Sequence, residues 1–157
     1  MKTVYLVRHS KAQQQHPSGD RFRALTAEGV ARIAAMLPRA VENGFRAELA
    51  LSSPYVRAVE TRDRFAGVMG ATRAEVSTAF APDASAHDAC IELAVWAEQY
   101  SSIALFTHNP LVGEIADLLL IPRSLLDLEF HTPTILALGF EHGTGLRQGK
   151  PLWVLHP

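Results

Sequence analysis

Two arginines and two histidines follow apolar runs at three separate places in the sequence. Arg8 and His9 come directly after the run TVYLV, and His108 follows the run SIALF after one threonine. Arg57 lies a few residues beyond a third, shorter apolar run. Arginine is suited to bidentate binding of phosphate or carboxylate. Together these residue types predict a pocket for a phosphoryl group.

Apolar runs alternate with segments of helical periodicity over the first 120 residues, which indicates an α/β fold. The expected strands are Thr3–Val7, Leu49–Leu51, Glu75–Phe80, Ser102–Phe106, Thr134–Phe140 and Leu152–Leu155. The expected helices run from a cap at Thr26 to Gly44, from Ser53 to about Met69, over Ala86–Gln99 and from Asn109 to about Leu120. We therefore expect three layers, in which helices flank a largely parallel central sheet and the last strands are antiparallel or at an edge.

The predicted sheet brings the candidate residues to one edge, because ligands of such folds bind beyond the carboxyl ends of the strands. Ser53-Pro54 and Asn109-Pro110 each place a capping residue before a proline, which is typical of a helix start. Helix N-termini at these positions would add free N–H groups and positive dipole ends to the same edge. The expected chemistry is that of an anion pocket.

Composition narrows the class of protein. The chain has 157 residues, which fits a single domain over 1–157, and fifteen basic against sixteen acidic residues give a net charge of −1. This balance disfavours nucleic acid or a membrane surface as a partner. One cysteine, no signal peptide and no apolar run of membrane-spanning length predict a cytoplasmic protein, with a monomer as the default for this size.

The seven histidines invite a metal hypothesis, but the sequence has neither an HxxxH pattern nor a paired Cys/His spacing. We therefore expect no metal and no cofactor. A dinucleotide-binding module is disfavoured because no G-x-G-x-x-G follows Thr3–Val7. His131 precedes a predicted strand that could approach the pocket, and Cys90 lies on an apolar helical face that predicts a core position.

Four ordered segments resemble motifs of the histidine phosphatase superfamily, which is phosphoglycerate mutase-like. The resemblance is closest to its small bacterial branch, the SixA-type phosphohistidine phosphatases, and extends from the N-terminus to about residue 120. The segments are LVRHS at 6–10, RALTAEG at 23–29, SPYVRAVET at 53–61 and THNPLVG at 107–113.

The resemblance implies a phosphoglycerate mutase-like fold and a role for each matched residue. His9 would be the nucleophile that forms a covalent phosphohistidine. Arg8, Arg57 and Arg23 would hold the phosphoryl oxygens, and His108 would donate a hydrogen bond to them as an imidazolium. The reaction would need no metal ion, because the arginines supply the positive charge.

The sequence departs from the superfamily pattern at two places. Ser10 replaces the usual glycine of the RHG motif, and no general acid can be placed securely. Asp83, His87 and Asp88 are candidates for the acid, although the surrounding residues also fit an ordinary turn and helix cap. An alkoxide leaving group needs a proton, whereas the imidazole of phosphohistidine can depart neutral. A site without a strong acid is therefore better suited to N–P than to O–P cleavage.

The leading hypothesis is a phosphatase that acts on a phosphorylated protein, namely a phosphohistidine domain. A small-molecule phosphomonoesterase that acts on a phosphorylated metabolite is the alternative on the same scaffold. A mutase would need longer segments to cover its substrate. A non-catalytic phosphate-binding module would not need both histidines, so their presence favours an enzyme.

Overall fold

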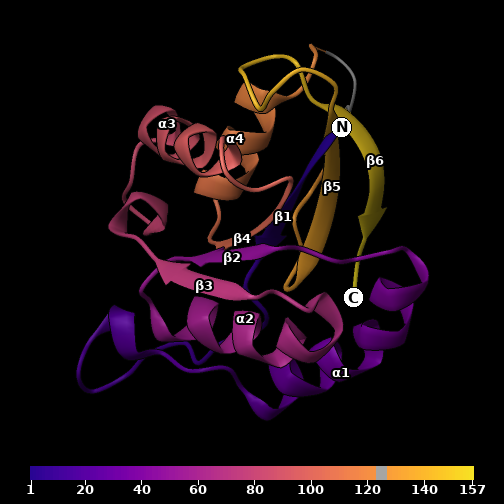
Figure 1. Ribbon diagram of the computed structural model, residues 1–157. Coiled ribbons are helices and arrows are strands. Elements are labelled where there is room, and N and C mark those ends of the chain that lie inside the picture. Colours follow the sequence, from indigo (N-terminus) through magenta and orange to yellow (C-terminus); the bar gives the residue numbers. More distant parts are fainter. Residues whose placement is uncertain (123–126) are drawn as a thin grey trace.

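The computed structural model, which describes residues 1–122 and 127–157, has a central sheet between two layers of helices (Figure 1). The strands are β1 (Lys2–Arg8), β2 (Leu49–Ser52), β3 (Arg73–Val76), β4 (Ser102–Thr107), β5 (Thr134–Phe140) and β6 (Lys150–Leu155). The helices are α1 (Ala27–Glu42), α2 (Val56–Met69), α3 (Ala86–Ala97) and α4 (Leu111–Leu119), with short 3-10 turns at Asp20–Phe22 and Thr78–Phe80.

The strand order is β3-β2-β4-β1-β5-β6. Strands β3, β2, β4 and β1 run parallel to one another, whereas β5 is antiparallel to β1 and β6 is antiparallel to β5. This topology confirms the predicted three-layer α/β fold, including the antiparallel strands at the end of the chain.

The two faces of β1 pack against different helices, because side chains alternate along a strand. Val4 and Leu6 belong to the core cluster formed with α3 and α4, and Tyr5 and Val7 belong to the cluster formed with α1 and α2. All four residues are buried. Figure 1 shows these helix pairs on opposite sides of the sheet. Burial on both faces explains why the sequence of β1 is an uninterrupted apolar run.

The structure confirms one predicted helix cap and corrects two. Thr26 caps α1, and its side chain accepts from the Gly29 N–H at 3.0 Å. Ser53 does not cap α2, which begins at Val56, because its hydroxyl accepts from the Tyr55 N–H at 3.2 Å ahead of the helix and also contacts the ring of a buried histidine. Helix α4 likewise begins at Leu111, because the Asn109 side chain donates to the Phe130 carbonyl instead of capping the helix.

The strand predicted at Glu75–Phe80 is misplaced and coincides with β3 only at Glu75 and Val76. Strand β3 ends at Val76, and the Ser77 hydroxyl accepts from the Ala79 N–H to start the 3-10 turn that follows. As an edge strand with mostly exposed residues, β3 has no apolar run to mark its bounds. Helix α3 ends at Ala97, two residues before the predicted end.

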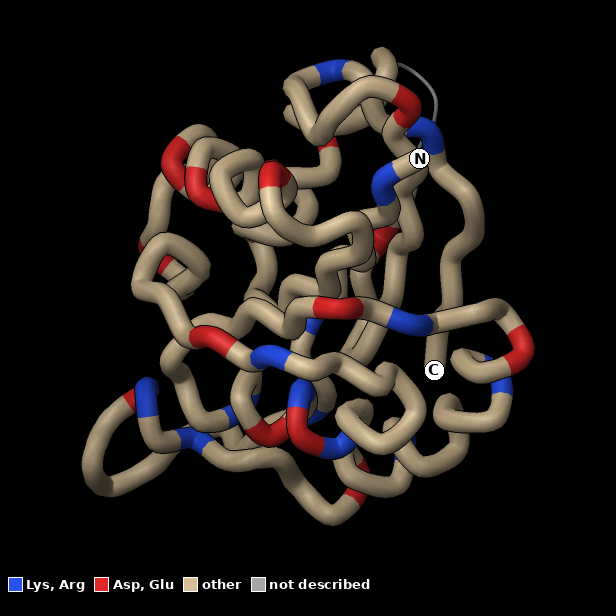
Figure 2. Tube along the Cα trace, in the orientation of Figure 1, with Lys and Arg blue, Asp and Glu red and all other residues tan. Residues whose placement is uncertain are grey.

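Acidic and basic positions are mixed along the chain trace, so any concentration of charge must be local (Figure 2). In the described ranges, none of the helices combines the length and the apolar character needed to cross a membrane. The same ranges contain no group of three His, Cys, Asp or Glu side chains placed to hold a metal ion.

Candidate active site

His9 and His108 lie side by side because β1 and β4 are parallel and in register. Arg8 pairs with Thr107 across the two strands, so the next residue on each strand is a histidine. The His9 N–H continues the ladder by donating to the Thr107 carbonyl at 3.0 Å. The two ring centroids are 5.1 Å apart, and the residues are only 7% and 1% exposed. The structure thus brings together the histidines that the sequence predicts to share a pocket.

The hydrogen bonds of His9 define which ring nitrogen carries its proton. Nδ1 lies 2.6 Å from the carbonyl oxygen of Ser10, which can only accept, so Nδ1 is the protonated nitrogen. Nε2 therefore keeps its lone pair. Burial lowers the pKa of His9 to about 3, and the positive charges of Arg57, Arg8 and Arg23 act in the same direction. At neutral pH the ring is neutral and Nε2 is available as a nucleophile.

His108 is held by Ser53 and Tyr55 at the start of α2. Its Nε2 lies 2.7 Å from the Ser53 hydroxyl, and its ring centroid lies 5.3 Å from that of Tyr55. Burial lowers the pKa of His108 to about 3, helped by the neighbouring His9 and the charge of Arg57. The ring is therefore neutral in this structure at neutral pH, which differs from the expected imidazolium chiefly because burial penalises the charged form.

Arg57 is brought to the histidine pair by the first turn of α2. The residue is 4% exposed and stacks over the Tyr55 ring at 5.1 Å from its centroid. Its Nη1 donates to the Asp20 carbonyl at 2.9 Å, and its Nη2 lies 3.2 Å from the Asp20 carboxylate. Its positive charge lowers the pKa of both His9 and His108.

The sequence reasoning missed Asp20, which joins Arg57 to Arg23. The other carboxylate oxygen of Asp20 accepts from Arg23 Nη1 at 2.7 Å, and Arg23 Nε donates to the Gln13 carbonyl at 2.5 Å. These contacts lower the pKa of the Asp20 carboxyl, with the hydrogen bond from Arg23 as the largest cause. The only sequence signal is an acid three residues before an arginine, which many surface turns share.

Arg8 approaches the histidines from the end of β1. Its Nη1 donates to the Phe130 carbonyl at 2.7 Å, and burial lowers its pKa although Glu129 acts in the opposite direction. The positive charge of Arg8 contributes to the low pKa of His9. The charges of Arg8, Arg23 and Arg57 therefore all act on His9, and Arg23 is the one of the three that only the family resemblance placed here.

Within the described part of the chain, three buried side-chain nitrogens have no hydrogen-bond partner, and all three belong to predicted site residues. They are Arg8 Nε, Arg57 Nε and His108 Nδ1. A buried polar group left without a partner costs roughly 1–3 kcal/mol. Because guanidinium N–H groups can only donate, the chemistry of this set fits the oxygens of an anion.

Ser10, the departure from the RHG motif, fixes the loop after His9 to two helices. Its N–H donates to Thr61 Oγ1 at 3.0 Å on α2, and its hydroxyl donates to the Gly29 carbonyl at 2.7 Å on α1. The absence of a side chain at Gly29 lets the backbone of Lys11 pack directly against α1, since a Cβ at Gly29 would lie 2.1 Å from the Lys11 carbonyl oxygen. Thr61 and Gly29 both lie in the segments that resemble superfamily motifs. The structure explains why these residue types are needed: position 61 supplies a hydroxyl acceptor, and position 29 has no room for a side chain.

The structure places the three candidate acids on the surface. Asp83 and Asp88 are exposed and line a groove of about 750 Å³ beside Tyr55, whereas His87 is exposed and lines a separate small cavity. Among the described residues, no hydrogen bond or ion pair joins any of the three to His9. Their expected role as a general acid gains no support from these positions.

The fold is that of known phosphatases. The structure of the protein histidine phosphatase SixA complexed with tungstate is similar with a TM-score of 0.83 at 24% identity, and 98% of this chain and 96% of that chain are covered. A protein from Agrobacterium tumefaciens described as a phosphohistidine phosphatase SixA gives 0.82 at 22% identity, with 99% and 98% covered. The chain has the SixA fold. The similarity covers nearly all of both chains, which confirms the predicted phosphoglycerate mutase-like fold.

More distant structures share the SixA fold with this chain. A mycobacterial glucosyl-3-phosphoglycerate phosphatase gives a TM-score of 0.67 at 12% identity, with 97% of each chain covered. No protein-family model matches the sequence, and no curated protein matches it either.

Proposed function

We propose that the protein is a metal-independent histidine phosphatase that hydrolyses phosphohistidine in proteins through a covalent intermediate on His9. The observation that carries the proposal is the state of His9, whose Nδ1–H is bound to the Ser10 carbonyl while Nε2 keeps its lone pair beside His108. The SixA fold supports it, because its solved examples include a protein histidine phosphatase complexed with tungstate, a tetrahedral oxyanion.

In the first step, Nε2 of His9 attacks the phosphorus atom. A bond forms between Nε2 and phosphorus, and the bond from phosphorus to the leaving group breaks with its electron pair. The ring then carries phosphorus on Nε2 and a proton on Nδ1, and the Ser10 carbonyl stabilises that positive charge. Water attacks phosphorus in the second step, the electron pair of the N–P bond returns to Nε2, and inorganic phosphate leaves with the proton lost by water.

The arginines and His108 stabilise the phosphoryl oxygens in both steps. Arg8 and Arg57 each offer a buried Nε–H that has no protein acceptor in the described residues, and Arg23 adds a third positive charge. These groups neutralise the charge of the transition state, as metal ions do in other phosphoryl-transfer enzymes. A bound dianion raises the pKa of His108, and its buried Nδ1 donates to a phosphoryl oxygen in the tautomer whose Nε2 accepts from the Ser53 hydroxyl.

The lack of a protonated acid at the histidine pair, among the described residues, favours phosphohistidine over a phosphate ester as the substrate, because the Asp20 carboxylate is ion-paired with Arg23 and Arg57, which lower its pKa. A phosphohistidine protonated at its free ring nitrogen releases neutral imidazole, so the enzyme need not supply a proton. A small-molecule phosphomonoesterase would need one, and the exposed Asp83 and Asp88 do not contact His9 or His108 in the described structure. We place the protein in the cytoplasm as a monomer, consistent with its lone, buried cysteine.

The proposal is tested with a phosphohistidine-containing protein and purified enzyme in the presence of EDTA. We expect hydrolysis that His9→Ala abolishes, together with a phosphoenzyme that is labile in acid and stable in alkali. His142→Ala, at an exposed position outside the site, is the matched control and should keep full activity. Binding without hydrolysis would instead indicate the non-catalytic module, and activity of His9→Ala or dependence on added metal would refute the mechanism.

A further inference from the structure

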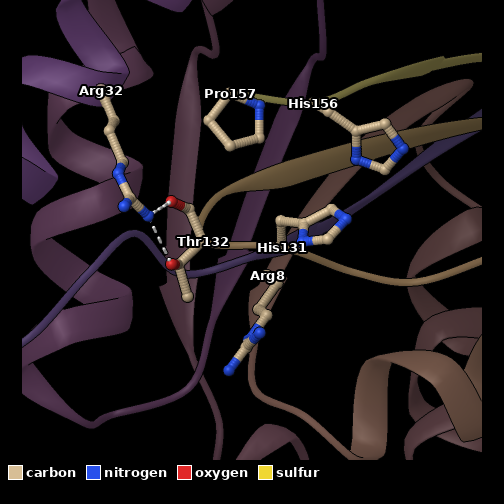
Figure 3. Close-up of a pocket in the computed structure, with 6 residues that line it drawn as sticks. All are labelled: Arg8, Arg32, His131, Thr132, His156 and Pro157. Atoms are coloured by element: carbon tan, nitrogen blue, oxygen red, sulfur yellow. Dashed lines mark hydrogen bonds between the residues drawn. The ribbon is translucent and has the colours of Figure 1, made fainter.

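A second cavity lies next to the candidate active site, on the side of Arg8. It has a volume of about 590 Å³ and is lined by Arg8, Arg32, His131, Thr132, His156 and Pro157. Figure 3 shows that these residues come from the end of β1, from α1, from the segment before β5 and from the segment after β6. We call it the Arg8–Arg32 cavity. Its volume is in the range of sites for small molecules or single side chains.

The residues that line the Arg8–Arg32 cavity carry positive charge. Among the described residues, two arginines and two histidines line it and no Asp or Glu side chain does, while Glu129, outside the lining, acts on Arg8 and His156. Arg32 is fixed by two hydrogen bonds of 2.9 Å from its Nη1 to the carbonyl and hydroxyl of Thr132, while its Nη2 pairs with Glu28 at 2.8 Å. Because Glu28 is about half exposed, solvent screens that pair, and a local attraction for anions remains.

The two histidines pack against each other at one wall of the cavity. The rings of His131 and His156 lie edge to face with centroids 5.0 Å apart. Thr134 accepts from the His131 N–H at 2.7 Å and lies 3.0 Å from His156 Nδ1. The buried Thr134 hydroxyl needs an acceptor for its proton, and Nδ1 of His156 is within reach, so neutral His156 carries its proton on Nε2. That N–H group is a donor for a ligand.

Arg8 connects this cavity to the histidine pair. It lines the cavity, and its charge also acts on His9, the adjacent residue. One guanidinium with five N–H donors can bind oxygens on two sides at once. Its Nε is buried and lacks a partner in the described residues, while its Nη1 is held by the Phe130 carbonyl.

We propose that the Arg8–Arg32 cavity is an anion subsite that binds a second acidic group, a carboxylate or a phosphate, of the molecule whose phosphoryl group lies at His9. The subsite rests on the proposed function, since it selects among phosphorylated substrates. The acidic group can belong to a small phosphorylated molecule or to an acidic side chain next to a phosphohistidine. In both cases Arg32 supplies the charge, and His131 and His156 supply hydrogen-bond donors.

The test compares ligands that differ only in the second acidic group, and it measures binding rather than turnover. Calorimetry gives the dissociation constants of phenylphosphonate and of its ortho, meta and para carboxy derivatives, and the readout is their ratio in each variant. We expect at least one carboxylated ligand to bind about tenfold more tightly to the wild type, as expected for one charge-assisted hydrogen bond. Arg32→Gln should abolish this preference, and His131→Gln should reduce it about threefold.

The controls separate the subsite from the proposed function. Arg64→Gln removes an exposed arginine on α2 and should leave the ratio unchanged. Because both affinities are measured on the same variant, a loss of folded protein does not change their ratio. If Arg32→Gln folds poorly, His131→Gln still tests the cavity, because His131 is exposed and its replacement should not disturb folding. Phosphohistidine peptides with Glu or Gln as the neighbouring residue form the second arm: a preference for Glu assigns the acidic group to a protein substrate.

Equal affinities for the plain ligand and all carboxylated ligands, or a preference that survives Arg32→Gln, would overturn the subsite. These results leave His9-dependent hydrolysis of phosphohistidine intact, so the proposed function would stand. If His9→Ala retains hydrolysis while the carboxylate preference is present, the mechanism fails and anion binding by the cavity remains.

Discussion

Substitution of Thr61 should disturb the site, because its hydroxyl connects α2 to Ser10, the residue after His9. It accepts from the Ser10 N–H at 3.0 Å and donates to the Arg57 carbonyl at 2.7 Å, and both Ser10 and Thr61 are fully buried. Thr61→Val keeps the shape of the side chain but leaves the Ser10 N–H without its acceptor. Such a loss costs roughly 1–3 kcal/mol of unfolding free energy.

We expect Thr61→Val to lower both stability and turnover. Each kcal/mol corresponds to about 2–4 °C in melting temperature for a chain of this size. Since the Ser10 carbonyl also binds Nδ1 of His9, movement of Ser10 should lower kcat for phosphohistidine hydrolysis more than it raises KM. Urea unfolding and steady-state kinetics measure the two effects.

Two further variants make the test specific. Thr61→Ser restores the hydroxyl and should recover most of kcat, which a purely steric explanation would not predict. Thr72→Val removes a hydroxyl whose bond to the Glu48 carbonyl is long, at 3.3 Å, and exposed, so it should change stability by less than about 0.5 kcal/mol. A Thr61→Val protein with wild-type stability and kcat would refute the positioning role of this hydrogen bond.

Three other changes have defined outcomes. Gly29→Ala places a Cβ 2.1 Å from the Lys11 carbonyl oxygen, so urea unfolding should show a loss of at least about 1–3 kcal/mol; an unchanged midpoint would contradict this close approach. Asp20→Asn removes the carboxylate that competes for Arg57, so calorimetry should show about tenfold tighter binding of inorganic phosphate, and weaker binding would mean that Asp20 instead orders the arginine. Because the pKa of His9 falls from 6.5 to about 3 on folding, the unfolded chain binds the extra proton between these values, and stability must decrease as pH falls through this range. His9→Gln should therefore reduce the slope of stability against pH by up to about 1.4 kcal/mol per unit, and an unchanged slope would contradict a neutral buried ring.

The sequence predicts the central strands well because burial on both faces leaves a clear pattern. Strand β5 has the predicted bounds, and β1 and β4 each differ by one residue per end or less. The predictions that fail concern residues whose burial leaves no hydrophobic pattern in the sequence. The exposed edge strand β3 is misplaced, and Ser53 and Asn109 lose their predicted capping roles because other side chains or carbonyls engage them in the folded protein.

The residues of the candidate site also fall into those that the sequence predicts and those that it does not. Arg8, His9, Arg57 and His108 follow strands or begin a helix, so their meeting follows from the order of elements. Asp20 lies in an irregular loop, and its contact with Arg57 depends on how that loop folds back. The pairing of His131 with His156 likewise depends on the antiparallel register of β5 and β6, which shifts between Ala137 and Leu138.

The meeting point of His9 and His108 has a topological cause. The chain that leaves β1 continues to α1, which packs on one face of the sheet, whereas the chain that leaves β4 continues to α4 on the other face. Adjacent parallel strands whose connections diverge in this way open a crevice at their carboxyl ends. The two histidines lie at that opening, one on each strand, and the antiparallel neighbour β5 brings His131 and the chain after β6 to the same end of β1. The candidate active site and the adjacent Arg8–Arg32 cavity thus share Arg8 because the sheet changes from parallel to antiparallel at β1.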